Sequence, residues 1–308
     1  MHPVGPVAAI DCGTNSTRLF VVDVSGKPLE RLMRITRLGE GVDSSGVLSS
    51  DAIDRCMSVL SEYRQVMERL GVVRGRLVAT SAARDASNGD EFLEAAGEVT
   101  GLTPELLEGT EEARLSMAGA VSDLDPEGGP FLIVDIGGGS TELVSGTGAD
   151  DPELLAVSMQ IGCVRVTERF LASDPPTPTE LKSAEAMVNE LLSEVVTDEP
   201  RFLNARRLVG LAGTVSTLAA LHVGLDEYDR DRLHHSVLTA DNVNDWYRTL
   251  AAEVREARLD RAGMVVGRED VIVGGAMILA LVMARFGFDE CLVSEADILD
   301  GMVVGLLD

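Results

Sequence analysis

Two segments of this 308-residue chain repeat each other, and the repeat limits the folds that the chain can adopt. Residues 7–26 (VAAIDCGTNSTRLFVVDVSG) align without a gap on residues 131–150 (FLIVDIGGGSTELVSGTGAD). Each copy reads as an apolar strand ending in aspartate, a glycine-rich turn, a Ser-Thr pair and a second strand. Because solenoids need several short repeats, a single distant repeat predicts two related domains. The alternative is that two glycine-rich hairpins share only the composition common to turns.

Strand-like and helix-like patterns alternate along the rest of the chain. Strands are expected at residues 7–10, 19–24, 77–79, 131–136 and 208–211, and helices at 49–70, 90–99, 110–120, 179–196 and 214–221. Ser49 or Ser50 is expected to cap the first of these helices, and Thr110 the third. The alternation predicts the α/β class with a mixed, helix-covered sheet.

The turn cluster Asp123–Pro130 (DLDPEGGP) is the best candidate for a hinge. It suggests an N-terminal domain over residues 1–125 and a C-terminal domain over residues 126–308, with the last helix free to pack back on the first domain. The uncharged stretch at 271–284 is shorter than the roughly 20 residues that span a bilayer, and it is expected to form a buried helix.

The chain is strongly acidic, with 51 aspartate and glutamate residues against 26 lysine and arginine residues and a formal net charge of -25. Such a charge disfavours nucleic acid and anionic membranes as partners. The cysteines and histidines have no metal-binding spacing, and the four scattered cysteines indicate reduced thiols in a cytoplasmic protein.

The repeated turns have the chemistry of phosphate-binding loops. Glycines let the backbone approach a ligand closely, and successive amide groups form an anion-binding nest to which Ser and Thr hydroxyls add donors. The expected phosphate-binding residues are Gly13, Thr14, Asn15 and Ser16 in the first loop and Gly137, Gly138, Gly139, Ser140 and Thr141 in the second. An aspartate that ends a buried strand is an oxygen ligand suited to Mg²⁺. Two such loops, one from each domain, are expected to clamp a chain of phosphates.

The order of these hairpins resembles the phosphate loops of the actin-like ATPase superfamily. Further segments narrow the resemblance to exopolyphosphatases and guanosine pentaphosphate phosphohydrolases: TRLGEGV (36–42), ATSAARDASN (79–88), EEARL (111–115), GCVRVTERF (162–170), GLAGTVSTLA (210–219) and DRAGMVVG (260–267). The resemblance implies two actin-like (RNase H-like) domains with an interdomain cleft. It also suggests a homodimer.

The resemblance assigns roles to individual residues. Glu112 matches the catalytic glutamate that activates the attacking water, and Glu142 is expected to assist the metal or the water. Asp135, Glu142 and Asp11 are the expected ligands of Mg²⁺, with Mn²⁺ as the alternative cation. Arg84 matches a substrate-binding arginine, and Gly213, Thr214 and Arg261 are further candidates for binding phosphate.

Structural explanations stay open for each of these residues. Glu111 and Glu112 also suit the first turn of a helix, where acids favour the positive end of the dipole. An aspartate at a strand end can accept turn amides, Gly213 and Thr214 can form a tight strand-to-helix turn, and arginines such as Arg261 are often solvated.

The expected activity is Mg²⁺-dependent removal of the terminal phosphate from inorganic polyphosphate. Longer members of the resembled family continue beyond the position of Asp308 here with regions that help to hold long substrates, so high processivity is not expected. A negative surface outside the site would also disfavour long polyanions, so we expect a preference for short chains. The alternatives are a pppGpp 5′-phosphohydrolase and a non-catalytic sensor of alarmone or polyphosphate.

Overall fold

The structure is a computed structural model that describes residues 5–307, and the chain forms two compact units. The residues up to Gly119 form the first unit together with those from Ile298 onward, and Ala120–Asp297 form the second. The boundary precedes the expected one at 125/126, because the turn that follows residue 120 is bonded to the second unit through Asp123 and His234. The expected hinge at residues 123–130 therefore lies within the second unit.

The first unit contains one five-stranded mixed sheet in the order β3-β2-β1-β4-β5. Its strands are β1 (Val7–Cys12), β2 (Ser16–Val22), β3 (Pro28–Ile35), β4 (Arg74–Ala79) and β5 (Pro104–Leu106), and its helices are α1 (Val42–Ser45), α2 (Ser50–Leu70), α3 (Ser81–Asp85), α4 (Gly89–Thr100), α5 (Gly109–Ala120, ending at the boundary) and α13 (Ile298–Leu307). β1 pairs antiparallel with β2 and parallel with β4.

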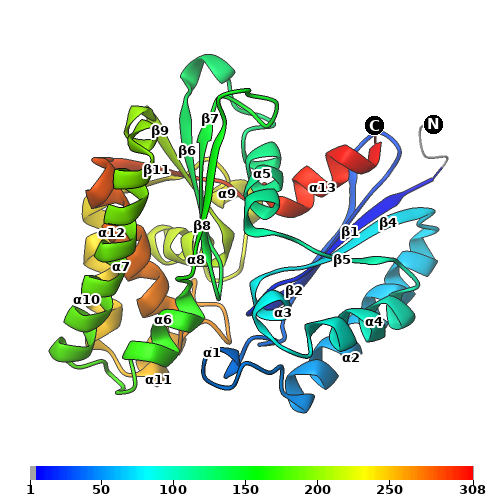
Figure 1. Cartoon of the computed structure of the whole chain (residues 1–308), viewed down its shortest axis with the longest axis horizontal. Coiled ribbons are helices and arrows are strands. Elements are labelled where there is room, and N and C mark those ends of the chain that lie inside the picture. The colour runs from blue at the N-terminus through cyan, green and yellow to red at the C-terminus, as the bar shows by residue number, and fades with distance from the viewer. Residues whose placement is uncertain (1–4, 308) are drawn as a thin grey trace. The chain divides into compact units, whose positions relative to one another are not determined.

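Both faces of this first sheet are covered by helices (Figure 1). Successive side chains of a strand point to opposite faces, and β1 follows that rule. Ala8 and Ile10 belong to the apolar cluster formed with α2 and α4, whereas Val7 and Ala9 belong to the cluster formed with α13. A strand buried on both faces reads as a continuous apolar run, which explains why residues 7–10 show no alternation.

The second unit contains a six-stranded mixed sheet in the order β10-β11-β9-β6-β7-β8. Its strands are β6 (Phe131–Ile136), β7 (Thr141–Gly146), β8 (Leu155–Met159), β9 (Arg207–Leu211), β10 (Val237–Thr239) and β11 (Glu290–Val293), and its helices are α6 (Cys163–Phe170), α7 (Pro178–Asp198), α8 (Ala212–Val223), α9 (Arg230–Leu233), α10 (Ala240–Ala252), α11 (Arg255–Leu259) and α12 (Ile272–Phe286), with 3-10 turns at Pro126–Gly128 and Pro200–Asn204.

The largest apolar cluster lies on one face of this second sheet, where α6, α7, α8, α10 and α12 pack. Helix α12 is buried along most of its length, as expected for the uncharged stretch at 271–284. Gly275 lets this helix approach α8, because a Cβ atom at that position would fall on the side chain of Thr214. Within residues 5–307, no helix has both the length and the apolar character needed to cross a membrane.

The repeat in the sequence is a repeat in the fold. β1 and β6 hold the same place in their sheets, each paired antiparallel with the next strand and parallel with β4 or β9. The predicted α/β class with two actin-like (RNase H-like) units is therefore confirmed by two mixed sheets of matching strand order.

Two predicted helix starts can be compared with the structure. Ser49 caps α2, where its side chain accepts a hydrogen bond of 3.2 Å from the amide of Ala52. The prediction that Thr110 caps its helix is wrong. The carbonyl of Glu108 already accepts from Glu111 and Glu112, so Thr110 lies inside the first turn of α5. The helix begins early because Leu107 is still bonded to Ala79 of β4 and the chain turns directly after it.

Candidate active site

The first glycine loop connects β1 to β2 and is held by its carbonyl groups. The amide of Gly13 donates to the carbonyl of Ser16 across the turn, at 3.0 Å. The carbonyl of Thr14 accepts from Gly39 at 2.8 Å, and that of Asn15 accepts from Thr36 and Arg37. The TRLGEGV segment is thus the support of this loop. Gly39 is required there because a Cβ atom would fall on the side chain of Thr14.

The second glycine loop connects β6 to β7 in the same way. The amide of Gly137 donates to the carbonyl of Ser140, again at 3.0 Å. The next carbonyls face the start of α6: Gly137 accepts from Cys163, Gly138 accepts from Val164 and Arg165, and Gly139 accepts from the Nε of Arg165 at 2.8 Å. The GCVRVTERF segment therefore supplies the support of the second loop.

These bonds fix the direction of the loop amides. In a trans peptide the carbonyl and the following N–H point in opposite directions. With the carbonyls of Gly137, Gly138 and Gly139 turned toward α6, the N–H groups of Gly138, Gly139 and Ser140 point away from that helix. Three successive N–H groups facing one way form a nest for an anion. In the first loop the same geometry turns the amides of Asn15 and Ser16 away from residues 36–39.

Two carboxylates lie opposite each other on the two strands that flank the second loop. Asp135 on β6 and Glu142 on β7 are direct cross-strand partners, so their side chains share one face of the sheet. Asp135 is 8% exposed and Glu142 is 1% exposed. The hydroxyl of Ser158 on β8 donates to Oε1 of Glu142 at 2.7 Å.

The first loop has a different pair in the corresponding positions. Arg18 lies opposite Asp11 and donates to its Oδ2 from both Nε and Nη2, at 3.0 and 2.6 Å. The position that holds Arg18 in the first hairpin holds Glu142 in the second. The two hairpins have the same strand pairing and differ in the charge of the side chains beside the loop.

The residues beside the second loop fit a divalent cation. Asp135 and Glu142 are direct cross-strand partners, so two carboxylates lie on one face of the sheet beside the loop. Carboxylate oxygens are also the ligands that Mg²⁺ prefers. Asp11 fits less well, because Arg18 engages its carboxylate.

Arg84 and Glu112 meet within the first unit. Arg84 lies in the last turn of α3, and its Nη1 is 3.7 Å from Oε2 of Glu112 in the first turn of α5. The same Nη1 donates to the carbonyl of Leu107 at 2.6 Å. Among the described residues, the buried Nη2 of Arg84 has no hydrogen-bond acceptor, nor does the Nδ2 of Asn15 find one. An arginine with one uncommitted nitrogen is suited to an incoming phosphate oxygen.

The other predicted phosphate-binding residues lie in the second unit. Thr141 is fully buried, and among the described residues its Oγ1 has no hydrogen-bond partner. Gly213 is in the first turn of α8, and a Cβ atom there would fall on the guanidinium of Arg268. The side chain of Thr214 is buried against Gly275, so its backbone is the part that can serve a ligand.

Arg268 was missed by the sequence reasoning, which chose Arg261 from the same segment. Arg261 donates to Oε2 of Glu253 at 2.7 Å and lies over the ring of Trp246. Arg268 instead places its guanidinium against Gly213 in the first turn of α8. The contact of Arg268 with Gly213 is not encoded in the sequence around Arg268.

Two thiols next to the glycine loops are poorly suited to act as nucleophiles. The hydrogen bond with Cys56, together with burial, raises the pKa of the Cys12 thiol well above its usual value. Burial also raises the pKa of the Cys163 thiol at the start of α6. Because the thiolate is the reactive form, a raised pKa disfavours both groups as nucleophiles at neutral pH.

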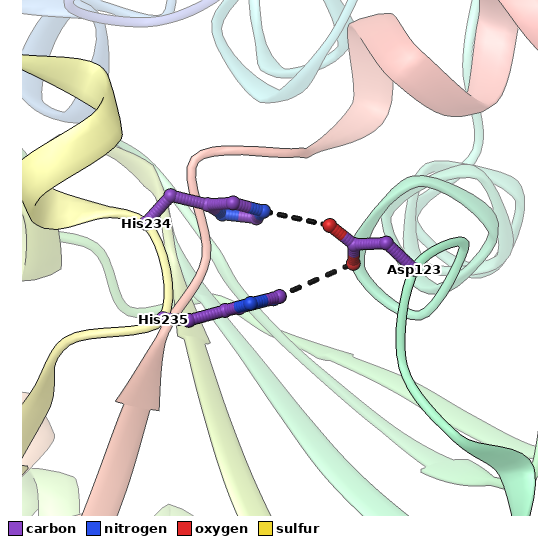
Figure 2. Close-up of side chains that lie close together, drawn as sticks. All are labelled: Asp123, His234 and His235. Atoms are coloured by element: carbon purple, nitrogen blue, oxygen red, sulfur yellow. Dashed lines mark hydrogen bonds and ion pairs between the residues drawn. The ribbon is translucent and has the colours of Figure 1, made fainter.

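A second polar cluster joins Asp123 to His234 and His235 (Figure 2). The Nε2 of His234 is 2.7 Å from Oδ2 of Asp123, and that of His235 is 3.4 Å from Oδ1. One potential ligand atom from each residue lies within 4.8 Å of the others, which raises the question of a metal site.

The hydrogen bonds of this histidine cluster argue against chelation. The two rings stack with centroids 3.9 Å apart and planes 25° apart. The Nδ1 of His234 accepts from the amide of Glu295, which leaves the ring proton on Nε2, where it is donated to Asp123. The cluster therefore anchors the turn that follows α5.

Two mixed sheets of matching strand order, each with a glycine loop beside charged side chains, define an α/β protein built from two related units. Residues 20–308 match the model of the Ppx/GppA phosphatase family. Exopolyphosphatase 2 of Mycobacterium tuberculosis is 42% identical over 316 positions, which cover 97% of this chain and 98% of that protein. The chain belongs to the Ppx/GppA phosphatase family.

Solved structures agree with this family assignment. The crystal structure of an exopolyphosphatase-like protein has a TM-score of 0.90 and 37% identity, covering 97% of this chain and 98% of that one. The Aquifex aeolicus Ppx/GppA family member has a TM-score of 0.81 and 35% identity, covering 98% of this chain and 97% of its own.

Proposed function

We propose that this protein is an exopolyphosphatase that hydrolyses the terminal phosphate of inorganic polyphosphate. The observation that carries the proposal is the loop at residues 137–140, whose carbonyls accept from the start of α6, next to the cross-strand pair of Asp135 and Glu142. An amide nest binds a phosphate without requiring basic side chains. The mycobacterial relative is named an exopolyphosphatase, which supports the same substrate class.

In the proposed reaction, residues of each unit have separate tasks. In the first unit, Glu112 accepts a proton from the attacking water, and Arg84 binds a phosphate oxygen through its uncommitted Nη2. In the second unit, the loop amides bind the phosphate on which negative charge accumulates, and Arg268 joins them at the start of α8. As water adds to the terminal phosphorus, the bond to the bridging oxygen breaks and the shortened chain leaves.

The carboxylates of Asp135 and Glu142 would hold Mg²⁺, with Mn²⁺ as the alternative. When bound, this cation neutralises part of the charge on the phosphate oxygens. We place Asp11 outside the pair that holds it, because Arg18 engages its carboxylate.

The charge of the chain is compatible with this anionic substrate. The net charge of -25 is a sum over the whole molecule, whereas backbone amides, a cation and a few arginines act locally. A negative surface elsewhere would repel long polyanions, so we propose a preference for short chains.

Hydrolysis of the 5′-phosphate of pppGpp would use the same loops and the same glutamate, and it is the alternative activity within this family. A side-by-side assay decides between the two. Phosphate release is measured with short polyphosphate, long polyphosphate, pppGpp and ATP, each with Mg²⁺, with Mn²⁺ and with EDTA. We expect the highest kcat/KM for short polyphosphate and no release in EDTA. A much higher value for pppGpp would replace the proposal, and release from none of them would indicate a sensor.

We also propose that the protein is located in the cytoplasm and forms a homodimer. Four buried free cysteines are in keeping with a reducing compartment, and fractionation of cells tests the location. The dimer has the family resemblance as its support, and light scattering of the purified protein tests it.

A further inference from the structure

Three polar side chains form a row across three adjacent strands of the second sheet. Asp135 on β6 is the direct partner of Glu142 on β7, and Glu142 is the direct partner of Ser158 on β8. Direct partners in antiparallel strands share a face, so all three side chains lie on one side of the sheet. The hydroxyl of Ser158 donates to Oε1 of Glu142 at 2.7 Å.

This hydrogen bond acts on the most buried carboxylate of the site, because Glu142 is only 1% exposed. The terminal bond of a glutamate side chain rotates over a broad range of angles unless a partner restricts it. With Oε1 held by a hydroxyl on the neighbouring strand, the plane of the carboxylate is fixed, and with it the direction in which Oε2 points. Partners of this kind orient the ligands of a metal and tune its affinity.

The first unit provides an internal comparison for the role of this hydroxyl. There the corresponding row is Asp11, Arg18 and Met33 on β1, β2 and β3. The sheet forms with the same strand order although its third position has no hydroxyl. The topology therefore does not require a serine at that place. The hydroxyl occurs only in the row that contains two carboxylates.

We propose that Ser158 is a positioning residue: it fixes the carboxylate of Glu142 and thereby sets the affinity of the Asp135–Glu142 pair for a divalent cation. The inference rests on the proposed function, since it concerns the same site. It extends that function to Ser158, a residue on an edge strand that belongs to neither glycine-loop segment of the sequence.

The test compares S158A, which removes the donor, with S158T, which keeps it. Mn²⁺ binding is measured by calorimetry on protein without substrate, and kcat and KM are measured separately with short polyphosphate. We expect S158A to weaken Mn²⁺ binding by roughly tenfold or more and to lower kcat at limiting Mn²⁺ by a similar factor. S158T should stay within about threefold of the wild type, since its hydroxyl can make the same bond.

S145A is the matched control. Ser145 is buried on β7 three residues after Glu142, so its side chain points to the other face of the sheet, and its removal should leave Mn²⁺ affinity unchanged. Should S158A not fold, S158C is used in its place, because a thiol is a weak donor of similar size.

The outcomes separate the two proposals. If S158A binds Mn²⁺ as the wild type does, or if the wild type binds none, the role of Ser158 is refuted. If S158A weakens Mn²⁺ binding while the wild-type protein releases no phosphate, the positioning role stands and the proposed function fails.

Discussion

Arg84 and Glu112 form an ion pair whose nearest atoms are 3.7 Å apart, with side chains that are 16% and 13% exposed. The pair joins the end of α3 to the start of α5, two elements that follow neighbouring parallel strands. A polyphosphate would be repelled by an isolated glutamate, so a guanidinium beside Glu112 allows an anionic substrate to approach a basic carboxylate. The proposed base and a proposed phosphate ligand are thus coupled.

Replacing Glu112 with glutamine should abolish most of the activity and preserve binding. The amide keeps the size of the side chain but cannot accept the proton of the attacking water. We expect kcat to fall by about 10²–10⁴-fold with little change in KM. Steady-state phosphate release from short polyphosphate checks this. Glu111→Gln is the control, since Glu111 is an exposed neighbour in the same turn. A variant E112Q that retains a tenth of the wild-type rate would exclude Glu112 as the base.

Replacing Arg84 with alanine should raise KM. A hydrogen bond to a charged group contributes about 1.5–3 kcal/mol, which corresponds to a roughly 10- to 100-fold weaker substrate interaction. Arg84→Lys should recover only part of the loss, because an ammonium group cannot bind the Leu107 carbonyl and a phosphate with the fixed geometry of a guanidinium. KM is compared with that of Arg114→Ala, which removes an exposed arginine of α5. Equal KM values for R84A and R114A would contradict the proposed contact.

The parts of the fold that the sequence predicts are those whose pattern is local. The strands β1 and β6 are apolar runs buried on both faces, and the repeated turns follow them directly. The edge strands β3 and β8 had no such signal. They are half-exposed, and Pro28–Ile35 mixes charged with apolar residues, so neither shows a clean period.

For the candidate site too, the sequence predicts only those residues whose pairing is local. Asp135 and Glu142 follow from the hairpin itself, because residues on either side of a tight turn become partners. Ser158 and Arg268 do not. Ser158 is brought to Glu142 by strand pairing and Arg268 to Gly213 by folding over the start of α8, and no spacing in the sequence encodes either contact.

The two strand-end aspartates should respond differently to removal of their charge. Asp135→Asn leaves Glu142 with half of the cation ligands, so we expect Mn²⁺ binding to weaken by at least about tenfold. Asp11→Asn instead removes the carboxylate charge that pairs with Arg18, which should lower stability and leave Mn²⁺ affinity nearly unchanged. Breaking a largely buried ion pair costs about 3–5 kcal/mol as an upper range. Calorimetry and urea unfolding measure the two effects, and equal loss of Mn²⁺ affinity in both variants would assign Asp11 to the metal.

The direction of the loop amides depends on Gly162, and this dependence gives a test of the nest that leaves every charged residue in place. Gly162 has φ −145° and ψ 170°, an extended conformation that alanine adopts without strain, so only the added methyl matters. That methyl would fall on the carbonyl carbon and oxygen of Gly138 and push the loop away from α6. We expect Gly162→Ala to lower the free energy of unfolding by about 1–3 kcal/mol, the range found for overpacking, and to raise KM for polyphosphate. Gly148→Ala is the control, because a Cβ atom at that position meets nothing within 4 Å. Urea unfolding and steady-state kinetics are measured on both variants. If G162A loses stability but keeps its KM, the amides of Gly138, Gly139 and Ser140 do not bind the substrate.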